Sequence, residues 1–586
     1  MRRREPLNLM DRKYVSMLTG GTLTMLMASV LLMSSSVIAG ITLGPEAVEG
    51  ITLAMPLYSL SAFVGSVFAL GVPIVYSAEI GRFNRREADR AFGFGLLSTM
   101  AAGVVLFLLI TLLGDAFLRS VHPTEATLAY AQGYLSWMRF TVLLLPMQLL
   151  LAEMVYADGD EGISTLSSIV EGIGNPLLSW FLSRSMGIRG ISLASFLFVA
   201  VSIGVMGIHF LKKRNTLRVS LCFSFGMLRK IVRYSLIESS SYLFLGLLSL
   251  GANWFVIMHF GPEYLILVSL ASFCRELQMV FDGIGEAIKP IIGIYRSERC
   301  TKGTRHIYRI AQRTAVLEGI AMTLFLLVSA PYIARWLGIT DPDMLSLATA
   351  GLRILGAGSV FVGLLYLSTA YYLVTDRIRL GLMICAMRDI LVTAPLSIGL
   401  ALAFGPYGFL VGVALAPLIA WGLIALKLRS RYPEEAPMFL GRQEAGSLLY
   451  SLAVEPEEIL RVRDRVGQDL TEQGYDQRTV RLAMLLTEEL LMLLYERNRG
   501  RRVLAECGVL TKKDRIRMIF RDSGARFDIA DADGPVSSLR RYVIANVTQQ
   551  MTTQGKFLTA MSFNRNAFEL SACRHQVSCE ESPSAQ

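Results

Sequence analysis

Charged side chains inside long apolar stretches are the residues of this sequence that could do chemistry. The group consists of Glu171, Arg275, Glu276, Asp282, Glu286, Arg388 and Asp389. A charge at the centre of a bilayer costs about 2.5–3.5 kcal/mol on insertion scales, so such residues usually face a protein interior or a water-filled cavity. Asp282 and Glu286 are four residues apart and would share one face of a helix. The pattern predicts a cavity whose carboxylates bind a proton or a cation, mainly in the second half of the chain.

The same residues also fit a structural role. Arg275 could neutralise the adjacent Glu276, and ion pairs between helices would hold a helical bundle together. Charged groups near a membrane surface can also extend their heads into water. The sequence leaves both roles open.

Composition places these residues in a membrane protein. The chain has 586 residues, of which 53% are hydrophobic, above the roughly 45–50% of soluble proteins. Apolar windows long enough for a bilayer core recur over the first three quarters of the chain. Lipid admits only helices and closed barrels, and continuous apolar windows favour helices. The net charge of +10 collects in loops between these windows and accompanies no recognition motif, so we expect no nucleic-acid partner.

Twelve transmembrane helices are expected to position the charged residues. We place them near 14–41, 51–80, 92–114, 128–154, 163–183, 190–211, 231–259, 264–294, 308–334, 345–373, 380–403 and 408–426. Lys and Arg gather in the loops on one side, and the chain starts with Arg2, Arg3 and Arg4. Because positive loops stay inside, we expect a multi-pass protein of the bacterial inner membrane with both termini in the cytoplasm.

The sequence repeats itself. Gly44-Pro45-Glu46 ends the first span and Gly261-Pro262-Glu263 ends the seventh, an offset of 261 − 44 = 217. Pro73 and Pro290 have the same offset, 290 − 73 = 217. Since each half has an even number of spans, the halves are expected to be parallel repeats. The predicted organisation is a cytoplasmic start at 1–13, an N-lobe at 14–211, a loop at 212–230 and a C-lobe at 231–430.

The composition becomes polar after the twelfth span. A linker at 431–445, a domain at 446–575 and a disordered tail at 576–586 are expected. We predict strands at 447–454, 502–509, 514–521, 556–563 and 566–571, and helices at 455–473, 476–497 and 536–550. The fold class is therefore an all-α polytopic membrane protein followed by a small α+β two-layer sandwich. The seven cysteines form no Cys-x-x-Cys pair, so neither a metal site nor a disulfide framework is expected.

The membrane region resembles the multidrug and toxic compound extrusion (MATE) transporters over roughly residues 10–430. Besides the repeated Gly-Pro-Glu, the matching motifs are Tyr134 to Arg139, Asp158-Gly159-Asp160, Gly174-Asn175-Pro176-Leu177-Leu178 and the segment 187–194. The resemblance implies an antiporter that exports small organic or cationic compounds by alternating access, driven by a proton or sodium gradient. It also implies a V-shaped cavity between two six-helix lobes, and no catalytic residue.

Two positions depart from the MATE pattern. The family commonly has an Asp five residues before a Gly of the first span, where this chain has Ser35 and Gly40. It commonly has Leu-Asp after the Asn of the fifth span, where Asn175 is followed by Leu178-Ser179. A serine does not titrate near neutral pH. Coupling is therefore expected to rest on the C-lobe carboxylates or Glu171, or to be lost.

The last domain resembles the GHKL-type ATPases, closest to the anti-sigma-factor serine kinases. Asp522-Ser523-Gly524 matches the Asp-x-Gly box, and Glu488 and Glu489 lie where the family has its magnesium-binding helix. The resemblance implies that Asp522 contacts adenine and that Gly524, Glu488 and Glu489 belong to the nucleotide-binding residues. The position expected to hold Asn is Met492 or Leu493. We therefore expect a nucleotide-binding remnant or a protein-interaction module, with no working ATPase or kinase and no requirement for ATP or magnesium.

Three functions remain open from the sequence. The first is the coupled exporter, which needs a small-molecule substrate, surrounding lipid and no cofactor beyond a proton or Na⁺. The second is a flippase for lipid-linked material in the same superfamily, which a basic cavity would favour. The third is a transport-deficient sensor or scaffold acting through a protein partner of the last domain. A monomer is expected in each case.

Overall fold

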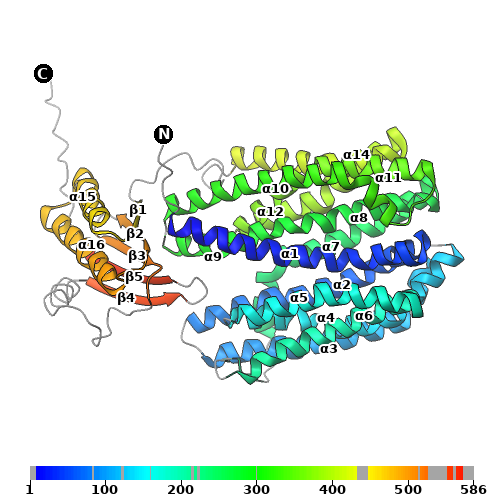
Figure 1. Cartoon of the computed structure of the whole chain (residues 1–586), viewed down its shortest axis with the longest axis horizontal. Helices are drawn as coiled ribbons and strands as arrows, with labels where there is room; N and C mark the ends of the chain where they lie inside the picture. The colour runs from blue at the N-terminus through cyan, green and yellow to red at the C-terminus, as the bar shows by residue number, and fades with distance from the viewer. Residues whose placement is uncertain are drawn as a thin grey trace, which may run out of the picture. The chain divides into compact units, whose positions relative to one another are not determined.

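The computed structural model describes residues 8–571. Within that range it leaves out residues 82–84, 121–123, 159, 213–214, 216, 221–224, 299, 376, 432–446, 512–514, 526–550 and 559–562. The chain divides into two compact units (Figure 1). The larger unit comprises Leu18–Ala287 and Ala311–Pro433. The smaller unit comprises Met1–Met17, Ile288–Ile310 and Glu434–Gln586.

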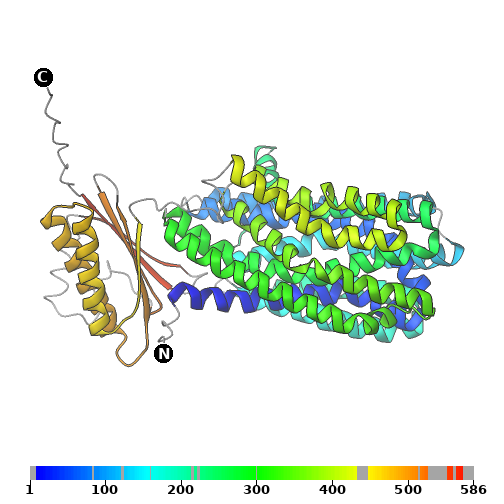
Figure 2. The same cartoon turned by 90° about the horizontal axis from the view of Figure 1, so that it is seen from above.

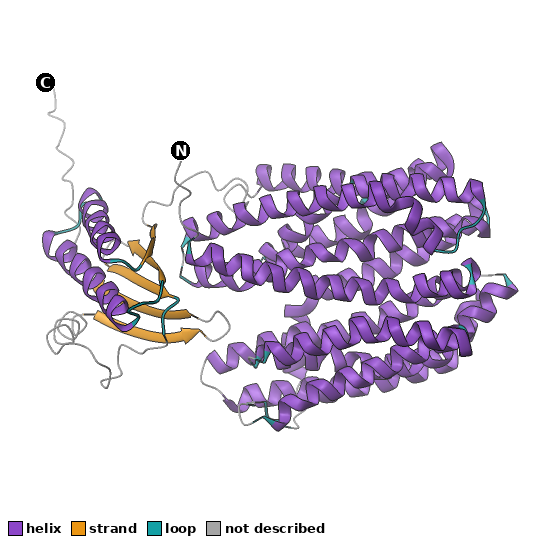
Figure 3. Cartoon of the chain, viewed as in Figure 1, coloured by secondary structure: helices purple, strands orange, loops and turns teal. Residues whose placement is uncertain are grey.

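The larger unit is helical (Figure 3), and three of its helices continue along the chain into the smaller unit. In its first half the helices are α1 (Leu9–Leu43), α2 (Pro45–Gly81), α3 (Arg85–Ser120), α4 (Glu125–Ala157), α5 (Glu161–Met186) and α6 (Ile188–Leu211). In the second half they are α7 (Phe225–Phe260), η1 (Pro262–Leu265), α8 (Ile266–Gln278), η2 (Met279–Phe281), α9 (Asp282–Ser297), α10 (Thr301–Trp336), α11 (Pro342–Ala357), α12 (Ser359–Val374), α13 (Ile378–Ala386), η3 (Met387–Leu391) and α14 (Thr393–Arg431). The three helices shared with the smaller unit are α1, α9 and α10. All the predicted spans lie on helical segments.

The number of membrane crossings is a separate question. Among the described residues, eight helices are long and apolar enough to cross a membrane, or nine if the bent pair α11 and α12 is one span. The count of twelve therefore stays a prediction.

The two halves of the larger unit share backbone features at matching positions. Gly44 and Gly261 have φ angles of 98° and 105°, a left-handed conformation that favours glycine. Gly187 and Gly405 likewise have φ angles of 62° and 67°. The hydroxyl oxygens of Thr52 and Ser269, which are 217 residues apart, lie within 3.2 Å of each other. Equivalent residues meet in this way at a two-fold axis, which supports the internal duplication.

The smaller unit contains an antiparallel sheet with strand order β1-β2-β3-β5-β4. The strands are β1 (Ser447–Ala453), β2 (Leu504–Thr511), β3 (Arg515–Asp522), β4 (Met551–Leu558) and β5 (Phe563–Ser571). The helices α15 (Pro456–Glu472) and α16 (Gln477–Arg497) cover one face of the sheet (Figure 2). Apolar residues of both helices and of β2, β3 and β5 form one buried core.

These elements agree with the predicted α+β sandwich in type and order. The fourth strand differs, because it begins at Met551 whereas we predicted residues 556–563. The predicted helix at 536–550 and the tail at 576–586 lie outside the described residues. Kinship with the GHKL ATPases stays a prediction.

Candidate functional site

A cavity of about 60 Å³ lies inside the C-lobe. Its polar lining includes Arg275, Gln278, Tyr366, Arg388, Asp389 and Thr393. A cavity of this size and polarity has room for several water molecules in this conformation. The structure therefore brings together three of the charged residues singled out in the sequence.

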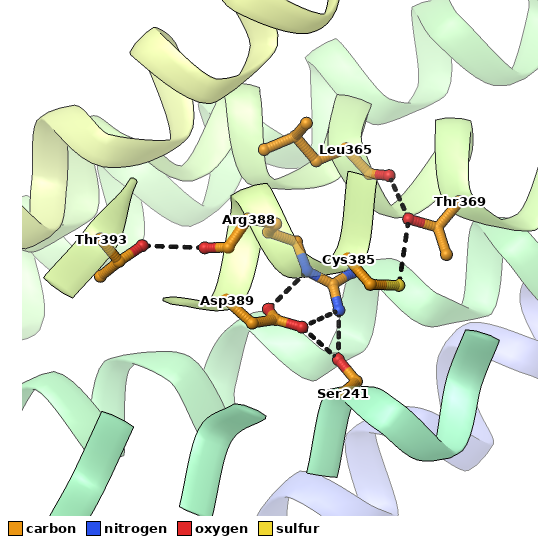
Figure 4. Close-up of polar contacts among 7 residues, drawn as sticks. All are labelled: Ser241, Leu365, Thr369, Cys385, Arg388, Asp389 and Thr393. Atoms are coloured by element: carbon orange, nitrogen blue, oxygen red, sulfur yellow. Dashed lines mark hydrogen bonds and ion pairs between the residues drawn. The ribbon is translucent and has the colours of Figure 1, made fainter. Parts of the chain in front are cut away.

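Arg388 and Asp389 form a buried ion pair (Figure 4). Arg388 Nε lies 2.7 Å from Asp389 Oδ1, and its Nη2 lies 2.9 Å from Asp389 Oδ2. The side chains are only 7% and 6% exposed. Ser241 from α7 bridges the pair, because Arg388 Nη2 donates to its Oγ at 2.5 Å and that hydroxyl donates to Asp389 Oδ2. The Arg388 guanidinium also lies 4.1 Å from the centroid of the Tyr366 ring, a cation–π contact.

A local break in the helix lets both charges point into one space. Residues Met387–Leu391 form a π-helical turn between α13 and α14. Such turns often occur at functional sites because they rotate side chains out of the α-helical order. The hydroxyl of Thr393 donates to the carbonyl oxygen of Arg388 at 2.8 Å, which satisfies a group released by the break.

Arg275 lines the same cavity, but has no hydrogen bond or ion pair with any described residue. The adjacent Glu276 lines a different cavity, together with Thr52 and Ser269. Arg275 therefore forms no hydrogen-bonded ion pair with Glu276 among the described contacts, although its charge interacts electrostatically with Glu276 and with Asp389. Two guanidinium groups and one carboxylate line the C-lobe cavity, so its lining carries a surplus positive charge.

The N-lobe holds a second cavity of about 50 Å³, lined by Ser35, Tyr58, Tyr134, Glu171 and Asn175 among others. Glu171 is the carboxylate of this lining. Its Oε2 accepts a hydrogen bond from Gln148 Nε2 at 2.5 Å.

Ser35 and Ser179 occupy the positions at which the resemblance implied carboxylates. Ser35 lines the N-lobe cavity. Ser179 is completely buried, and its hydroxyl donates to Asn175 Oδ1 at 2.9 Å. The hydroxyls serve as neutral hydrogen-bonding groups, which leaves Glu171 to supply the charge on this side.

Asp282 and Glu286 lie outside the linings of these cavities, and each interacts with other groups. Asp282 begins α9, directly after the 3-10 turn Met279–Phe281 that follows α8.

Sequence reasoning missed three neutral residues that contact the charged groups, Gln148, Ser241 and Tyr366. A polar amide within an apolar span was a signal for Gln148, whereas nothing distinguished Ser241 from the other serines nearby.

The smaller unit holds a separate buried polar cluster, hereafter the Asp522 pocket, formed by Asp522, Gly524, Asn498 and Asn564. Asp522 Oδ1 accepts hydrogen bonds from Asn564 Nδ2 at 2.9 Å and from the Gly524 amide at 3.0 Å. Its Oδ2 is buried without a hydrogen-bond partner among the described residues. Burial raises the pKa of this carboxyl to about 6. Asn498 at the end of α16 accepts from the Ala525 amide at 2.9 Å.

The two glutamates expected at a magnesium site both interact with other groups. Glu488 pairs with Arg463 of α15 at 2.9 Å, and Glu489 has contacts of its own. Among the described residues, no group of three or more His, Cys, Asp or Glu side chains is arranged to hold a metal. Sequence reasoning also missed Asn498 and Asn564, whose role depends on contacts distant in the chain.

Comparison with known proteins concerns mainly the larger unit. Residues 22–181 match the model of the MatE family. A solved structure described as the inward-facing conformation of a multidrug resistance MATE family transporter of the MOP superfamily superposes with a TM-score of 0.63 and 17% identity. The superposition covers 70% of this chain and 98% of the chain of that transporter. The membrane region has the MATE fold.

Two further relatives show how far the MATE fold has diverged. The multidrug export protein MepA of Staphylococcus haemolyticus (strain JCSC1435) is 21% identical over 397 residues, which cover 66% of this chain and 86% of that protein. A MOP superfamily transporter from Pyrococcus furiosus superposes with a TM-score of 0.63 at 16% identity, and covers 73% of this chain and 97% of that chain. That transporter is described as having reverse polarity of the binding pocket, which suggests a different function for it.

Proposed function

We propose that this protein is an alternating-access secondary transporter that exports small organic compounds across the bacterial inner membrane, with both termini in the cytoplasm. The observation that carries the proposal is a cavity in each lobe of a MATE fold, lined by ionisable groups inside apolar helices. The name of the Staphylococcus relative supports export of several kinds of compound. A monomer with two lobes suffices for this cycle, and its energy comes from a proton or sodium gradient.

Coupling rests on Glu171 in the N-lobe. It is the charged group of its cavity, and Gln148 and Ser202 form a hydrogen-bonded chain beside it, since Gln148 Nε2 also lies 3.0 Å from Ser202 Oγ. A carboxylate held in this way can take up and release a proton or a sodium ion as the cavity opens to either side. The Arg388–Asp389 pair is internally neutralised and serves to shape the C-lobe cavity.

Glu171→Gln is expected to lower gradient-driven export by roughly 5–150-fold, the usual range for coupling between linked sites. The amide keeps the hydrogen bond with Gln148 but loses the charge. The measurement is flux of ethidium in proteoliposomes under an imposed proton or sodium gradient. Glu125→Gln, an exposed change at the start of α4, is the matched control. Absence of gradient-dependent flux for a broad panel of compounds in the unmodified protein would contradict the transport proposal itself.

A second candidate function is transport of compounds that carry an anionic group, including lipid-linked material. It is favoured by the guanidinium of Arg275, which forms no hydrogen-bonded ion pair with any described residue, and by the surplus positive charge of the C-lobe cavity. A buried charge lacks the stabilisation that water would give, so an anionic group entering this cavity would restore it. The Pyrococcus relative, with its reported reversal of pocket polarity, supports this alternative.

Arg275→Gln is expected to weaken binding of an anionic substrate by about 1.5–3 kcal/mol, the value of a charged hydrogen bond, and to spare cationic substrates. Competition binding of a matched anionic and cationic dye to the purified protein measures both effects. Arg353→Gln is the control, because Arg353 is exposed and donates to the Leu327 carbonyl oxygen instead. An Arg275 variant that binds the anionic dye as tightly as the unmodified protein does would remove the support for an anionic substrate.

The Asp522 pocket is proposed to bind an adenine nucleotide without hydrolysing it. Its buried, unpartnered carboxylate oxygen is suited to accept a hydrogen bond from an exocyclic amine. The engaged Glu488 and the absence of an Asn on α16 at the expected place argue against a magnesium-dependent reaction. Titration of the full-length protein with ATP, without and with magnesium, tests this by binding and by phosphate release.

A further inference from the structure

A second charged cluster is buried in the smaller unit. Glu298 follows α9, and its Oε1 lies 2.7 Å from Arg565 Nε, while its Oε2 pairs with Arg521 Nη2. Arg521 Nη1 lies 2.7 Å from Glu506 Oε2, and Tyr295 donates its hydroxyl to Glu506 Oε1 at 2.6 Å. The Glu298, Arg521 and Glu506 side chains are 0%, 1% and 2% exposed. Two carboxylates and two guanidiniums leave the cluster neutral.

The cluster joins two segments that are far apart in the sequence. Tyr295 lies in the last turn of α9 and Glu298 directly follows that helix, whereas Glu506, Arg521 and Arg565 belong to the sheet. Their neighbours Cys507 and Phe520 pack in the core beneath α15 and α16. Successive strand residues face opposite ways, so Glu506 and Arg521 lie on the outer face of the sheet, away from these helices. The outer face therefore carries a binding surface whose partner is the α9–α10 turn.

Charge complementarity gives this contact its specificity. Removal of one member from a buried ion pair is strongly destabilising, because the remaining charge has no water to replace its partner. Glu298 is shared by two arginines, so it is the centre of the contact. The Arg521 guanidinium also lies 5.0 Å from the centroid of the Tyr295 ring.

The same two strands carry the Asp522 pocket on their other face. Arg521 precedes Asp522 in β3, and Asn564 precedes Arg565 in β5. The strands pair antiparallel, with Arg521 opposite Arg565 and Asp522 opposite Asn564. Each strand thus places one residue in the charged cluster and the adjacent residue in the Asp522 pocket. A shift of either strand moves both sites together.

We propose that the outer face of the sheet docks onto the α9–α10 turn through Glu298, and that the β3–β5 pair transmits changes at the Asp522 pocket to helices α9 and α10. Both helices continue along the chain from the smaller unit into the larger one. A ligand or partner at Asp522 would then adjust the ease with which these helices move during transport. The inference is independent of what the Asp522 pocket binds and of which compound is transported.

Hydrogen exchange on the full-length protein in lipid nanodiscs tests the docking. In Glu298→Gln the amide cannot neutralise two arginines, so exchange in β3, β5 and residues 295–304 is expected to rise on the order of 100-fold. Arg296→Gln, an exposed change in the same turn, is expected to leave exchange unaltered. Should Glu298→Gln fail to fold, Glu298→Asp retains the charge and is expected to raise exchange in the same segments by less. Unaltered exchange in β3 and β5 in the folded variant would overturn the docking.

The transmission is tested from the opposite face. Asp522→Ala is expected to raise exchange in residues 295–304 by roughly 5–150-fold, the usual range of coupling between sites. Asp464→Ala, an exposed change on α15, is the control. Exchange that rises around Ser523 but stays constant at residues 295–304 would overturn the transmission while leaving the docking intact.

Discussion

Arg388→Met is expected to lower the free energy of unfolding by about 3–5 kcal/mol, because it leaves the buried carboxylate of Asp389 without its ion-pair partner. Asp389 would retain the hydroxyl of Ser241 as a hydrogen-bond partner, while Arg275 lines the same cavity without forming an ion pair with it. The π-helical turn and the C-lobe cavity that it lines should deform, so transport is expected to be lost as well. Denaturant-induced unfolding of the purified protein in detergent measures the change.

The double variant Arg388→Met/Asp389→Leu separates the charge effect from the loss of packing. Replacement of a buried ion pair by apolar residues is often neutral or stabilising, so most of the lost stability should return. Arg90→Met is a matched surface control, since Arg90 pairs with Glu87 and both side chains are about one-third exposed. It should cost about 0–1 kcal/mol. A single Arg388→Met variant as stable as the Arg90 variant would show that the pair does not hold the lobe together.

The positions of the helices followed from the sequence because apolar length is a local property. The repeated Gly-Pro-Glu also predicted matching backbone positions, and the positive φ angles of Gly44 and Gly261 agree with it. Glycine is read directly from the sequence, and a left-handed turn requires it. Elements of the last domain were predicted for the same reason, since its strands and helices have clear periodicity.

The partners of the charged residues did not follow from the sequence. Arg275 and Glu276 are adjacent, yet successive residues on a helix point about 100° apart, and these two line different cavities. Ser241 is 148 residues from Asp389, and Glu298 is 223 residues from Arg521. Such contacts depend on how helices and strands pack, and local patterns carry no information about them. The π-helical turn at Arg388 is likewise a response to packing that helix propensity does not predict.

Asp522→Asn is expected to stabilise the smaller unit above pH 6 and to weaken binding in its pocket. Burial raises the pKa of Asp522 from an ordinary 3.8 to about 6, so the folded state favours the protonated carboxyl. That contribution is fully present below about pH 4 and is lost as the pH rises through 6. The difference corresponds to at most about 3 kcal/mol. The variant should therefore match the unmodified protein near pH 4 and exceed it by up to this amount near pH 7.5.

Urea unfolding of the full-length protein is measured across this pH range. Hydrogen exchange in β3 is the readout for the smaller unit. Glu506, whose pKa burial raises to about 7, contributes equally to both proteins and cancels in the comparison. Asp476→Asn is a control of opposite sign, because hydrogen bonds from Thr479 hold the pKa of Asp476 below its ordinary value. Its carboxylate stabilises the start of α16 above pH 4, and that stabilisation is lost as the pH falls.

The same Asp522→Asn change replaces one carboxylate oxygen by an amide nitrogen, so the acceptor at the Oδ2 position is retained only if the side chain turns its oxygen outward. Turning it outward would direct the amide nitrogen at Asn564 Nδ2, which now donates to Asp522 Oδ1. Two donors would then face each other, so binding of ATP should weaken by about 1.5–3 kcal/mol. A gain in stability together with a loss of binding would identify Asp522 as a residue retained for its ligand at a cost in stability. Stability that falls at pH 7.5 would instead mean that the carboxylate is held by the fold itself.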